Sequence, residues 1–351
     1  MLRAMSDTET DLFLALSPEV VLRAVEAAGL SCKPVCFPLN SFENRVYLME
    51  LDDDTRIVSK FYRPRRWSRE QILEEHTFLS DLARDDVPVC PTLPFPDGET
   101  LKETNGIKYC LFEVRGGRAP EDLTDEDVER LGMLVARMHN VAVRRTAEHR
   151  IHLTAETYVW DNLAWLEEHE VLPAPLARRY LDAATYIAGV AEEGYRDIDM
   201  HRIHGDFHLG NLLLRDGVFN VLDFDDMVVG PPVQDLWLAL PGRDEHTLRH
   251  REAFLEGYER FRSFDRSTLG LIEPLRGLRM IHYATWLARR WHDPIFPRTW
   301  PHFGTEEYWE EETGSLEDLV RFIQTDRGEA PPVEEVPALT NKDYFWDWEG
   351  D

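Results

Sequence analysis

Three polar residues with a fixed spacing, Asp206, Asn211 and Asp223, could carry out chemistry in this chain of 351 residues. They follow the pattern Asp-x4-Asn-x11-Asp. A carboxylate can accept a hydroxyl proton, and amide and carboxylate oxygens suit a hard cation that takes its other ligands from water and phosphates. The same order of groups serves phosphoryl transfer, where a loop aspartate is followed by an asparagine and an aspartate on metal. The pattern therefore indicates phosphoryl transfer to a hydroxyl group.

The local sequence predicts how these side chains are brought together. Two short apolar runs, Leu212–Leu214 and Phe219–Leu222, are separated by a turn that contains Asp-Gly, which is a strong signal for a β-hairpin. A hairpin returns the chain to its starting end. We therefore expect Asn211 and Asp223 at its open end, with Asp206 on the loop that leads into it. An ordinary turn would explain any one of these residues, but the ordered set favours a site.

Lys60 is one of five lysines in the chain and lies inside the apolar run Ile57–Phe61. Its compact ammonium could reach phosphate oxygens, although a lysine at a sheet edge could also extend into solvent. A helix predicted to follow this run carries Glu74 and Glu75, either of which could pair with Lys60. We favour Glu75 because it lies on the apolar face of that helix, with Leu79. The alternative is that both carboxylates are solvated.

Several polar residues near Asp206 have roles other than metal binding. The spacing of His201, His204 and His208 does not fit a zinc pattern. We expect His204 to support the loop through hydrogen bonds. Asp235 precedes an apolar helix start, where a carboxylate can accept backbone N–H groups. It is expected to cap that helix and to brace the loop.

The composition is that of an acidic globular protein. The formal net charge of −27 makes non-specific binding to nucleic acid or anionic lipid unfavourable. The four cysteines are too few and too scattered for a disulfide framework. No run approaches the ~18 apolar residues of a membrane span, and the N-terminus lacks the apolar core of a signal peptide. We therefore expect a cytoplasmic monomer without nucleic-acid or membrane partners.

The distribution of strand and helix signals predicts an α+β protein with two lobes. Strand patterns occupy the first third of the chain, and helical periodicity with capping motifs dominates the rest. We place the boundary near Arg115–Gly117. The expected parts are residues 1–114, 115–324 and an acidic tail, 325–351. The expected helices begin at Ser17, Ser68 and Thr124 or span Thr157–Glu168, Leu176–Glu193, Glu245–Ser263 and Leu271–Trp291.

The motif His204-Gly205-Asp206, with Asn211 and Asp223, resembles the aminoglycoside phosphotransferase and choline kinase superfamily, which has a protein-kinase-like fold. Further stretches narrow the resemblance to a bacterial group of serine/threonine protein kinases of the stress response. These stretches are Leu39–Tyr47, Lys60–Pro64, Gln71–His76, Val233–Trp237 and Gly270–Arg276. The resemblance runs from about Ser17 to about Ile323, which is nearly the whole folded part.

The resemblance implies a bilobal protein-kinase-like fold that uses ATP and Mg²⁺. Asp206 would be the catalytic residue, and Asn211 and Asp223 would be the metal ligands. Lys60, paired with Glu75, would hold the α- and β-phosphates. The acceptor would be a Ser or Thr hydroxyl of a protein that the sequence does not identify.

The resemblance also implies a nucleotide hinge at Phe112–Arg115, so that Glu113 and Arg115 are expected beside the adenine. The chain departs from ordinary protein kinases in its phosphate loop, where Asn40–Asn44 replaces the glycine-rich motif. These turn-forming residues can still present backbone N–H groups. Two alternatives stay open. One is a kinase of small alcohols, such as aminoglycosides, choline or homoserine. The other is a pseudokinase, which the intact candidate residues disfavour.

Overall fold

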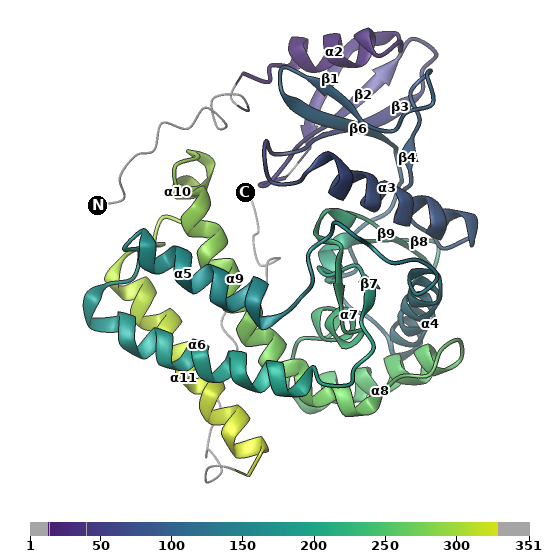
Figure 1. The fold of residues 1–351 in the computed structure, drawn as a ribbon. Coiled ribbons are helices and arrows are strands. Elements are labelled where there is room, and N and C mark those ends of the chain that lie inside the picture. The colour runs from purple at the N-terminus through teal and green to yellow at the C-terminus, as the bar shows by residue number, and fades with distance from the viewer. Residues whose placement is uncertain (1–12, 14, 40, 329–351) are drawn as a thin grey trace.

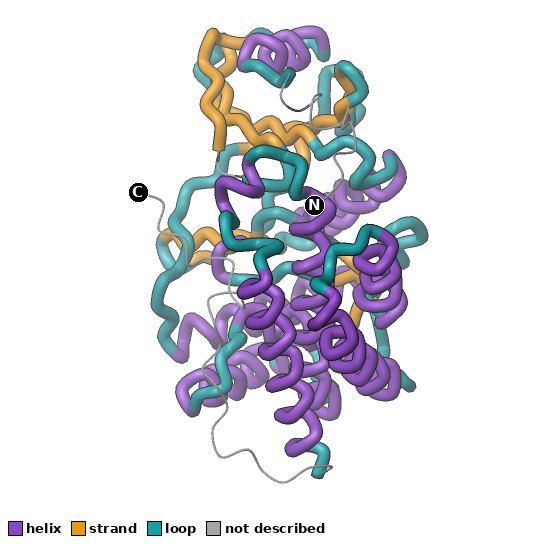
Figure 2. The backbone as a smooth tube through the Cα atoms, turned by 90° about the vertical axis from the view of Figure 1, so that its left-hand side faces the viewer, coloured by secondary structure: helices purple, strands orange, loops and turns teal. Residues whose placement is uncertain are grey.

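The chain forms a strand-rich part above a helical part, as the ribbon in Figure 1 and the tube in Figure 2 show. This computed structural model describes residues 13, 15–39 and 41–328. The predicted α+β fold with a strand-rich N-terminal lobe and a mainly helical C-terminal lobe is confirmed. Most of the predicted tail, from residue 329 to residue 351, lies outside the described residues.

The N-terminal lobe is built on an antiparallel sheet of six strands in the order β1-β2-β3-β6-β4, with β5 paired to β6. The strands that sequence patterning predicted within residues 36–62 and 106–114 are present. The two shortest strands were not predicted. The six are β1 (Cys32–Leu39), β2 (Arg45–Leu51), β3 (Arg56–Phe61), β4 (Thr92–Leu93), β5 (Lys102–Thr104) and β6 (Ile107–Glu113).

Two helices cover opposite sides of this sheet (Figure 1), namely α2 (Pro18–Ala27) and α3 (Arg69–Arg84). Successive side chains of a strand face opposite ways. Accordingly, Phe61 joins the apolar cluster under α2, whereas the next residue, Tyr62, packs with the α3 side. The predicted capping box of α3 is present, with reciprocal bonds between Ser68 and Gln71. Lys60, one residue before Phe61, therefore belongs to the α3 side.

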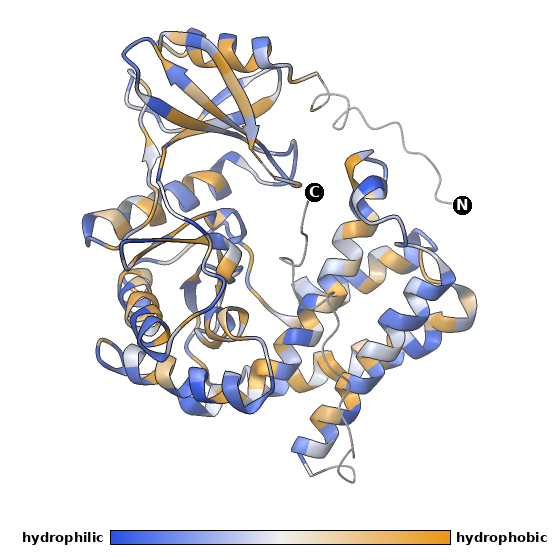
Figure 3. Cartoon of the chain, turned by 180° about the vertical axis from the view of Figure 1, so that it is seen from behind, coloured by the Kyte–Doolittle hydropathy of each residue, from blue (hydrophilic) through white to orange (hydrophobic). Residues whose placement is uncertain are grey.

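The C-terminal lobe is a set of helices around two small antiparallel sheets. One sheet pairs β7 (His201–Ile203) with β10 (Val228–Gly230), and the other is the hairpin of β8 (Leu212–Arg215) and β9 (Val218–Val221). The colouring of Figure 3 alternates along the helices, as expected for helices with one buried face. The helices are α4 (Asp125–Ala142), α5 (Asp161–Glu168), α6 (Ala174–Gly194), α7 (Val233–Ala239), α8 (Glu245–Glu259), α9 (Ile272–Arg290), α10 (Ile295–Thr299) and α11 (Glu306–Asp326).

One large apolar core runs through the C-terminal lobe and reaches the end of α3, where Phe78, Leu79 and Leu82 join it. The helix α3 therefore packs against both lobes. The predicted lobe limits, residues 114 and 324, stay a prediction. Several helices differ from expectation: α5 begins at Asp161, α8 ends at Glu259, and α10 and α11 were not predicted. Within the described ranges, no helix is both long enough and apolar enough to cross a bilayer.

Candidate active site

The predicted hairpin is present and brings the two candidate metal ligands to one end. Its turn has positive φ angles at Asp216 (51°) and Gly217 (76°), the conformation that suits a tight two-residue hairpin turn. At the open end, the N–H of Leu222 donates to the C=O of Asn211 at 2.8 Å. Asn211 and Asp223 therefore flank the hairpin side by side.

Asp206 lies on the loop before the hairpin and is held by three neighbours. Asn211 Nδ2 donates to its backbone C=O at 2.9 Å and lies 3.3 Å from its Oδ2. Arg279 Nη2, from α9, lies 2.8 Å from its Oδ1, and His208 Nε2 lies 3.4 Å from its Oδ2. Burial opposes ionisation, but the charges of Arg279 and His208 outweigh it and hold the pKa of Asp206 well below its usual range. Asp206 is thus kept as a carboxylate that can accept a proton.

His204 supports this loop, as predicted. Its Nδ1 accepts from the N–H of Asp206 at 3.2 Å, and its Nε2 donates to the C=O of Leu222 at 2.8 Å. The next residue, Gly205, has a φ of 83°, and a Cβ there would lie 2.3 Å from the backbone oxygen of Asp226. Only glycine fits at this position.

Asp235 braces the same loop, but it does not cap a helix. Its carboxylate accepts the N–H groups of His204 at 3.0 Å and Gly205 at 2.9 Å, and it contacts His139 Nε2 at 3.1 Å. The predicted capping role is wrong, because α7 begins earlier, with Pro232 at the cap position and no side-chain cap bond. Asp235 is fully buried inside the first turn, which leaves its carboxylate free to bind the loop.

Lys60 is buried among three carboxylates. Its Nζ lies 3.0 Å from Asp223 Oδ1, 3.1 Å from Asp225 Oδ1 and 3.5 Å from Glu75 Oε1. Burial would lower the pKa of Lys60, but these charges outweigh it and raise the pKa well above the usual value. Glu74 instead accepts backbone N–H groups of residues 148–150. The structure therefore resolves the open choice in favour of Glu75.

Asp223 combines an unusual backbone with an accessible side chain. Its φ of 54° and ψ of 72° lie in the left-handed region, where strain in residues other than glycine is often associated with functional sites. Its side chain is 51% exposed, whereas those of Lys60 and Glu75 are 6% and 1% exposed. Among the residues described, no group of three or more His, Cys, Asp or Glu side chains could hold a metal. Asn211 and Asp223 fit a hard cation that completes its shell with phosphate oxygens and water.

The predicted hinge lies at the end of β6. The carboxylate of Glu113 pairs with the guanidinium of Arg115 at 2.8 Å, and both side chains are largely exposed. The side chains of Glu113 and Arg115 therefore pair with each other, whereas Lys60 pairs with the carboxylates of Glu75, Asp223 and Asp225. Outside helices and strands, no backbone–backbone hydrogen bond of the described chain involves residues 114–117. Their peptide groups are available for a base, so the backbone role of the hinge stays a prediction.

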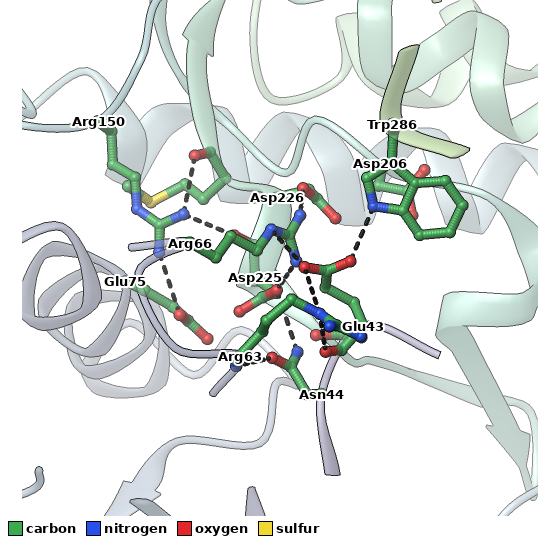
Figure 4. A network of polar contacts seen from close by, with 12 residues as sticks. Glu43, Asn44, Arg63, Arg66, Glu75, Arg150, Asp206, Asp225, Asp226 and Trp286 are labelled. Carbon is green, nitrogen blue, oxygen red and sulfur yellow. Dashed lines mark hydrogen bonds and ion pairs between the residues drawn. The ribbon is translucent and has the colours of Figure 1, made fainter. Parts of the chain in front are cut away.

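A charged network between the lobes contains residues that the sequence reasoning missed (Figure 4). Arg66 forms ion pairs with Asp225 and Asp226, which lie about 160 residues away in sequence. Arg150 Nη2 lies 3.1 Å from Glu75 Oε2, and Asn44 Nδ2 donates to Asp225 Oδ2 at 3.1 Å. The arginine-rich and aspartate-rich runs are visible in the sequence. Their pairing is not, because it depends on how the lobes meet.

The loop that replaces a glycine-rich motif is anchored by Glu43. Its carboxylate accepts from Trp286 Nε1 at 2.8 Å and from Arg290 Nη2 at 2.7 Å, both on α9. Burial opposes ionisation, but Arg66 and Arg290 outweigh it and lower the pKa of Glu43 to about 2. Within the loop, the N–H of Asn44 donates to a serine hydroxyl and is already used. The anchoring of this loop by Glu43 was not predicted.

The fold and this geometry define a class of protein. Protein-kinase-like phosphotransferases combine a strand-rich lobe that carries a lysine–glutamate pair with a helical lobe that carries an aspartate loop and two metal ligands. This chain has the same arrangement, with Asn211 and Asp223 as the candidate metal ligands. Residues 36–272 match the model of the phosphotransferase enzyme family, and the chain belongs to that family.

Relatives and solved structures agree with this assignment. The chain is 37% identical over 326 residues to stress response kinase A of Escherichia coli (strain K12), covering 93% of this chain and 97% of that protein. It is 36% identical, with the same coverage, to the serine/threonine protein kinase RdoA of Salmonella typhimurium (strain LT2). The narrower resemblance indicated by the sequence is thereby confirmed.

Two solved structures share the fold at low sequence identity. Amicoumacin kinase hAmiN, in complex with AMP-PNP, Ca²⁺ and Ami, has a TM-score of 0.71 at 20% identity and covers 92% of this chain and 98% of that one. A microcompartment-associated aminopropanol kinase has a TM-score of 0.65 at 21% identity, covering 88% of this chain and 98% of that one. At these identities the likeness concerns the kinase-like fold alone.

Proposed function

We propose that the protein uses ATP and Mg²⁺ to phosphorylate Ser or Thr hydroxyls of proteins in a bacterial stress response. One observation carries the phosphoryl-transfer part of this proposal. The buried ammonium of Lys60 lies 3.0 Å from Asp223 and is backed by Glu75 at 3.5 Å. A fixed ammonium beside an accessible carboxylate is suited to holding nucleotide phosphates next to a cation.

Each residue has a role in the proposed mechanism. Asp206, kept as a carboxylate by Arg279, orients the acceptor hydroxyl and accepts its proton as the γ-phosphoryl group of ATP moves to the acceptor oxygen. Lys60 orients the phosphates. Asn211 and Asp223 would hold magnesium, which supplies positive charge to the phosphate oxygens when it is bound. The backbone of the hinge would meet the adenine.

The choice of a protein acceptor is supported by the relatives. Two proteins that are 36–37% identical over nearly their whole length carry the names stress response kinase A and serine/threonine protein kinase RdoA. The presence of all the candidate catalytic residues supports turnover and disfavours a pseudokinase. Proton transfer to Asp206 would serve any hydroxyl, so the site chemistry by itself is neutral about the acceptor.

A kinase of small alcohols is the second candidate, and one structural observation favours it. A cavity of about 280 Å³ lies beside the catalytic loop and is lined by Asp226, Tyr158 and Trp286, among others. That volume is close to the lower end for small-molecule sites. It would also accept the side chains of a short protein segment.

One experiment separates the two candidates. The purified protein is incubated with labelled ATP and magnesium, together with a generic protein acceptor or a panel of small alcohols, and autophosphorylation is followed in parallel. Phosphoserine or phosphothreonine on protein supports the proposal. Phosphate found only on a small alcohol, at rates typical of metabolic enzymes, would transfer the assignment to the second candidate.

A further inference from the structure

The cavity beside the catalytic loop has a lining unlike the rest of this acidic protein. Its volume is about 280 Å³, and it lies between the linker from β3 to α3, the segment that leads into α5, and the end of α9. Of the lining residues in the described structure, one, Asp226, is a carboxylate. Five are arginines, namely Arg63, Arg65, Arg66, Arg289 and Arg290, whereas burial and neighbouring arginines lower the pKa of His282 to about 3 and keep its ring neutral. The cavity is thus a basic site in a chain of net charge −27.

Part of this positive charge is already paired. Arg63 Nη2 lies 2.9 Å from Asp293, Arg290 Nη2 lies 2.7 Å from Glu43, and Arg66 pairs with Asp226. These contacts fix the guanidinium groups in place. They make the positive wall of the cavity rigid, which lowers the entropic cost of binding.

Arg289 differs from the paired arginines. Its Nε is buried and has no hydrogen-bond partner among the residues that the structure describes. Its guanidinium lies over the ring of Trp165, 5.2 Å from the ring centre. A buried donor without an acceptor is costly, and an arginine fork is suited to carboxylate and phosphate oxygens. Arg289 therefore provides a donor for an anionic ligand.

One face of α9 (Ile272–Arg290) connects the cavity with the neighbourhood of Asp206. Arg279, His282, Trp286 and Arg290 are spaced by three, four and four residues, which places them on one stripe of the helix. Arg279 binds Asp206 at 2.8 Å, whereas the other three line the cavity. At a rise of about 1.5 Å per residue, Arg289 lies about 15 Å along the helix from Arg279, so a group bound there would lie a few residues away from a hydroxyl placed at Asp206.

We propose that this cavity binds an anionic group, a carboxylate or a phosphate, that lies a few residues from the acceptor hydroxyl. The inference rests on the proposed function and names its substrate class as acidic or already phosphorylated protein segments. A cationic acceptor would meet five guanidinium groups, three of which are already paired with carboxylates. An acidic segment would be repelled by the protein as a whole, so a local basic site is what would allow its recognition.

The test compares Ser and Thr peptides that differ only in their flanking residues. One set carries Asp or Glu, one carries phosphoserine, one carries neutral Gln, and one carries Lys. We expect kcat/KM for one of the anionic sets to exceed that of the Gln set by on the order of 10-fold, as for a charge-assisted hydrogen bond. The Glu and phosphoserine sets distinguish a carboxylate from a phosphate ligand.

Variants tie this preference to the cavity. Arg289→Gln should bring the ratio of anionic to neutral kcat/KM towards one. Arg65→Gln, at an exposed position of the lining, should lower the same ratio, and a thermal melt checks that the variant is folded. The matched control is Arg178→Gln on α6, whose side chain is 92% exposed and distant from the lining, and its ratio should equal that of the wild type.

The outcomes separate this inference from the function on which it rests. Phosphorylation of neutral and basic peptides as efficiently as anionic ones would overturn the inference and leave the protein kinase intact. A preference that survives both cavity variants would also overturn it. If no peptide of any set is phosphorylated while a small alcohol is, the proposed function fails, and the inference fails with it.

Discussion

Arg279 Nη2 lies 2.8 Å from Asp206 Oδ1, so that a helix of the C-terminal lobe holds the carboxylate of the catalytic loop across 73 residues of sequence. This contact fixes the orientation of the carboxylate and favours its ionised form. Arg279 shares this carboxylate with Asn211 and His208. It is the main neighbour of Asp206 that the sequence did not predict.

The first prediction follows from this contact. Arg279→Gln should raise the pKa of Asp206, because the largest attractive charge on that carboxylate is removed. In the proposed mechanism Asp206 acts in its ionised form, so the acidic limb of the plot of kcat against pH should move to higher pH. The control Arg298→Gln, at an exposed position of α10, should leave the profile in place. An unshifted acidic limb in Arg279→Gln would count against this role.

The second prediction concerns the two candidate metal ligands, Asn211 and Asp223. Asp223→Ala should weaken magnesium-dependent nucleotide binding more than Asn211→Ala, because a carboxylate brings a full charge to a hard cation and an amide does not. Titration of magnesium at fixed nucleotide, followed by calorimetry, measures both variants. Equal magnesium affinity in the wild type and in Asp223→Ala would remove this residue from the metal site.

The third prediction concerns the buried lysine. Lys60→Met should reduce ATP use and also lower stability by about 1–3 kcal/mol, since Glu75 and Asp225 would lose a cationic neighbour. Adding Glu75→Gln should restore part of the stability, but not the activity. Denaturant melts of the two single variants and the double variant measure this coupling. Additive losses would show that the pair does not act as a unit.

The fourth prediction uses the pKa of Glu43, which is lowered to about 2 from a usual value of 4.5. A lowered pKa in the folded state contributes stability above pH 4.5 that is lost as the pH falls towards 2. Glu43→Gln should therefore melt at a lower temperature than the wild type at pH 7. The difference should narrow between pH 4.5 and pH 2. Thermal melts across this range provide the check, and a difference independent of pH would contradict it.

Local features of the site were predictable from the sequence. The hairpin follows from an Asp-Gly turn between apolar runs, and the α3 cap follows from Ser68 and Gln71. The support by His204 followed from its position beside Asp206. Each of these features depends on residues close together in sequence, so short-range rules describe them.

The features that sequence reasoning missed depend on contacts between distant segments. Arg66 meets Asp226 across 160 residues, and Glu43 meets Arg290 across 247. No local periodicity encodes such pairs. The error on Asp235 has a different cause. The helix α7 begins at Val233, directly after two prolines, so Asp235 lies inside its first turn. The carboxylate of Asp235 accepts a hydrogen bond from the N–H of His204 instead.

The central claim is that Asp206 and its neighbours transfer phosphate from ATP to Ser or Thr on protein. Its most direct test is mass spectrometry of a protein acceptor after incubation with ATP and magnesium, with the wild type beside Asp206→Asn. We expect phosphoserine or phosphothreonine with the wild type and a loss of at least ~10²-fold in rate with the variant, whose fold and nucleotide binding persist. Equal rates in the two proteins, or no phosphate on protein with the wild type, would contradict the account.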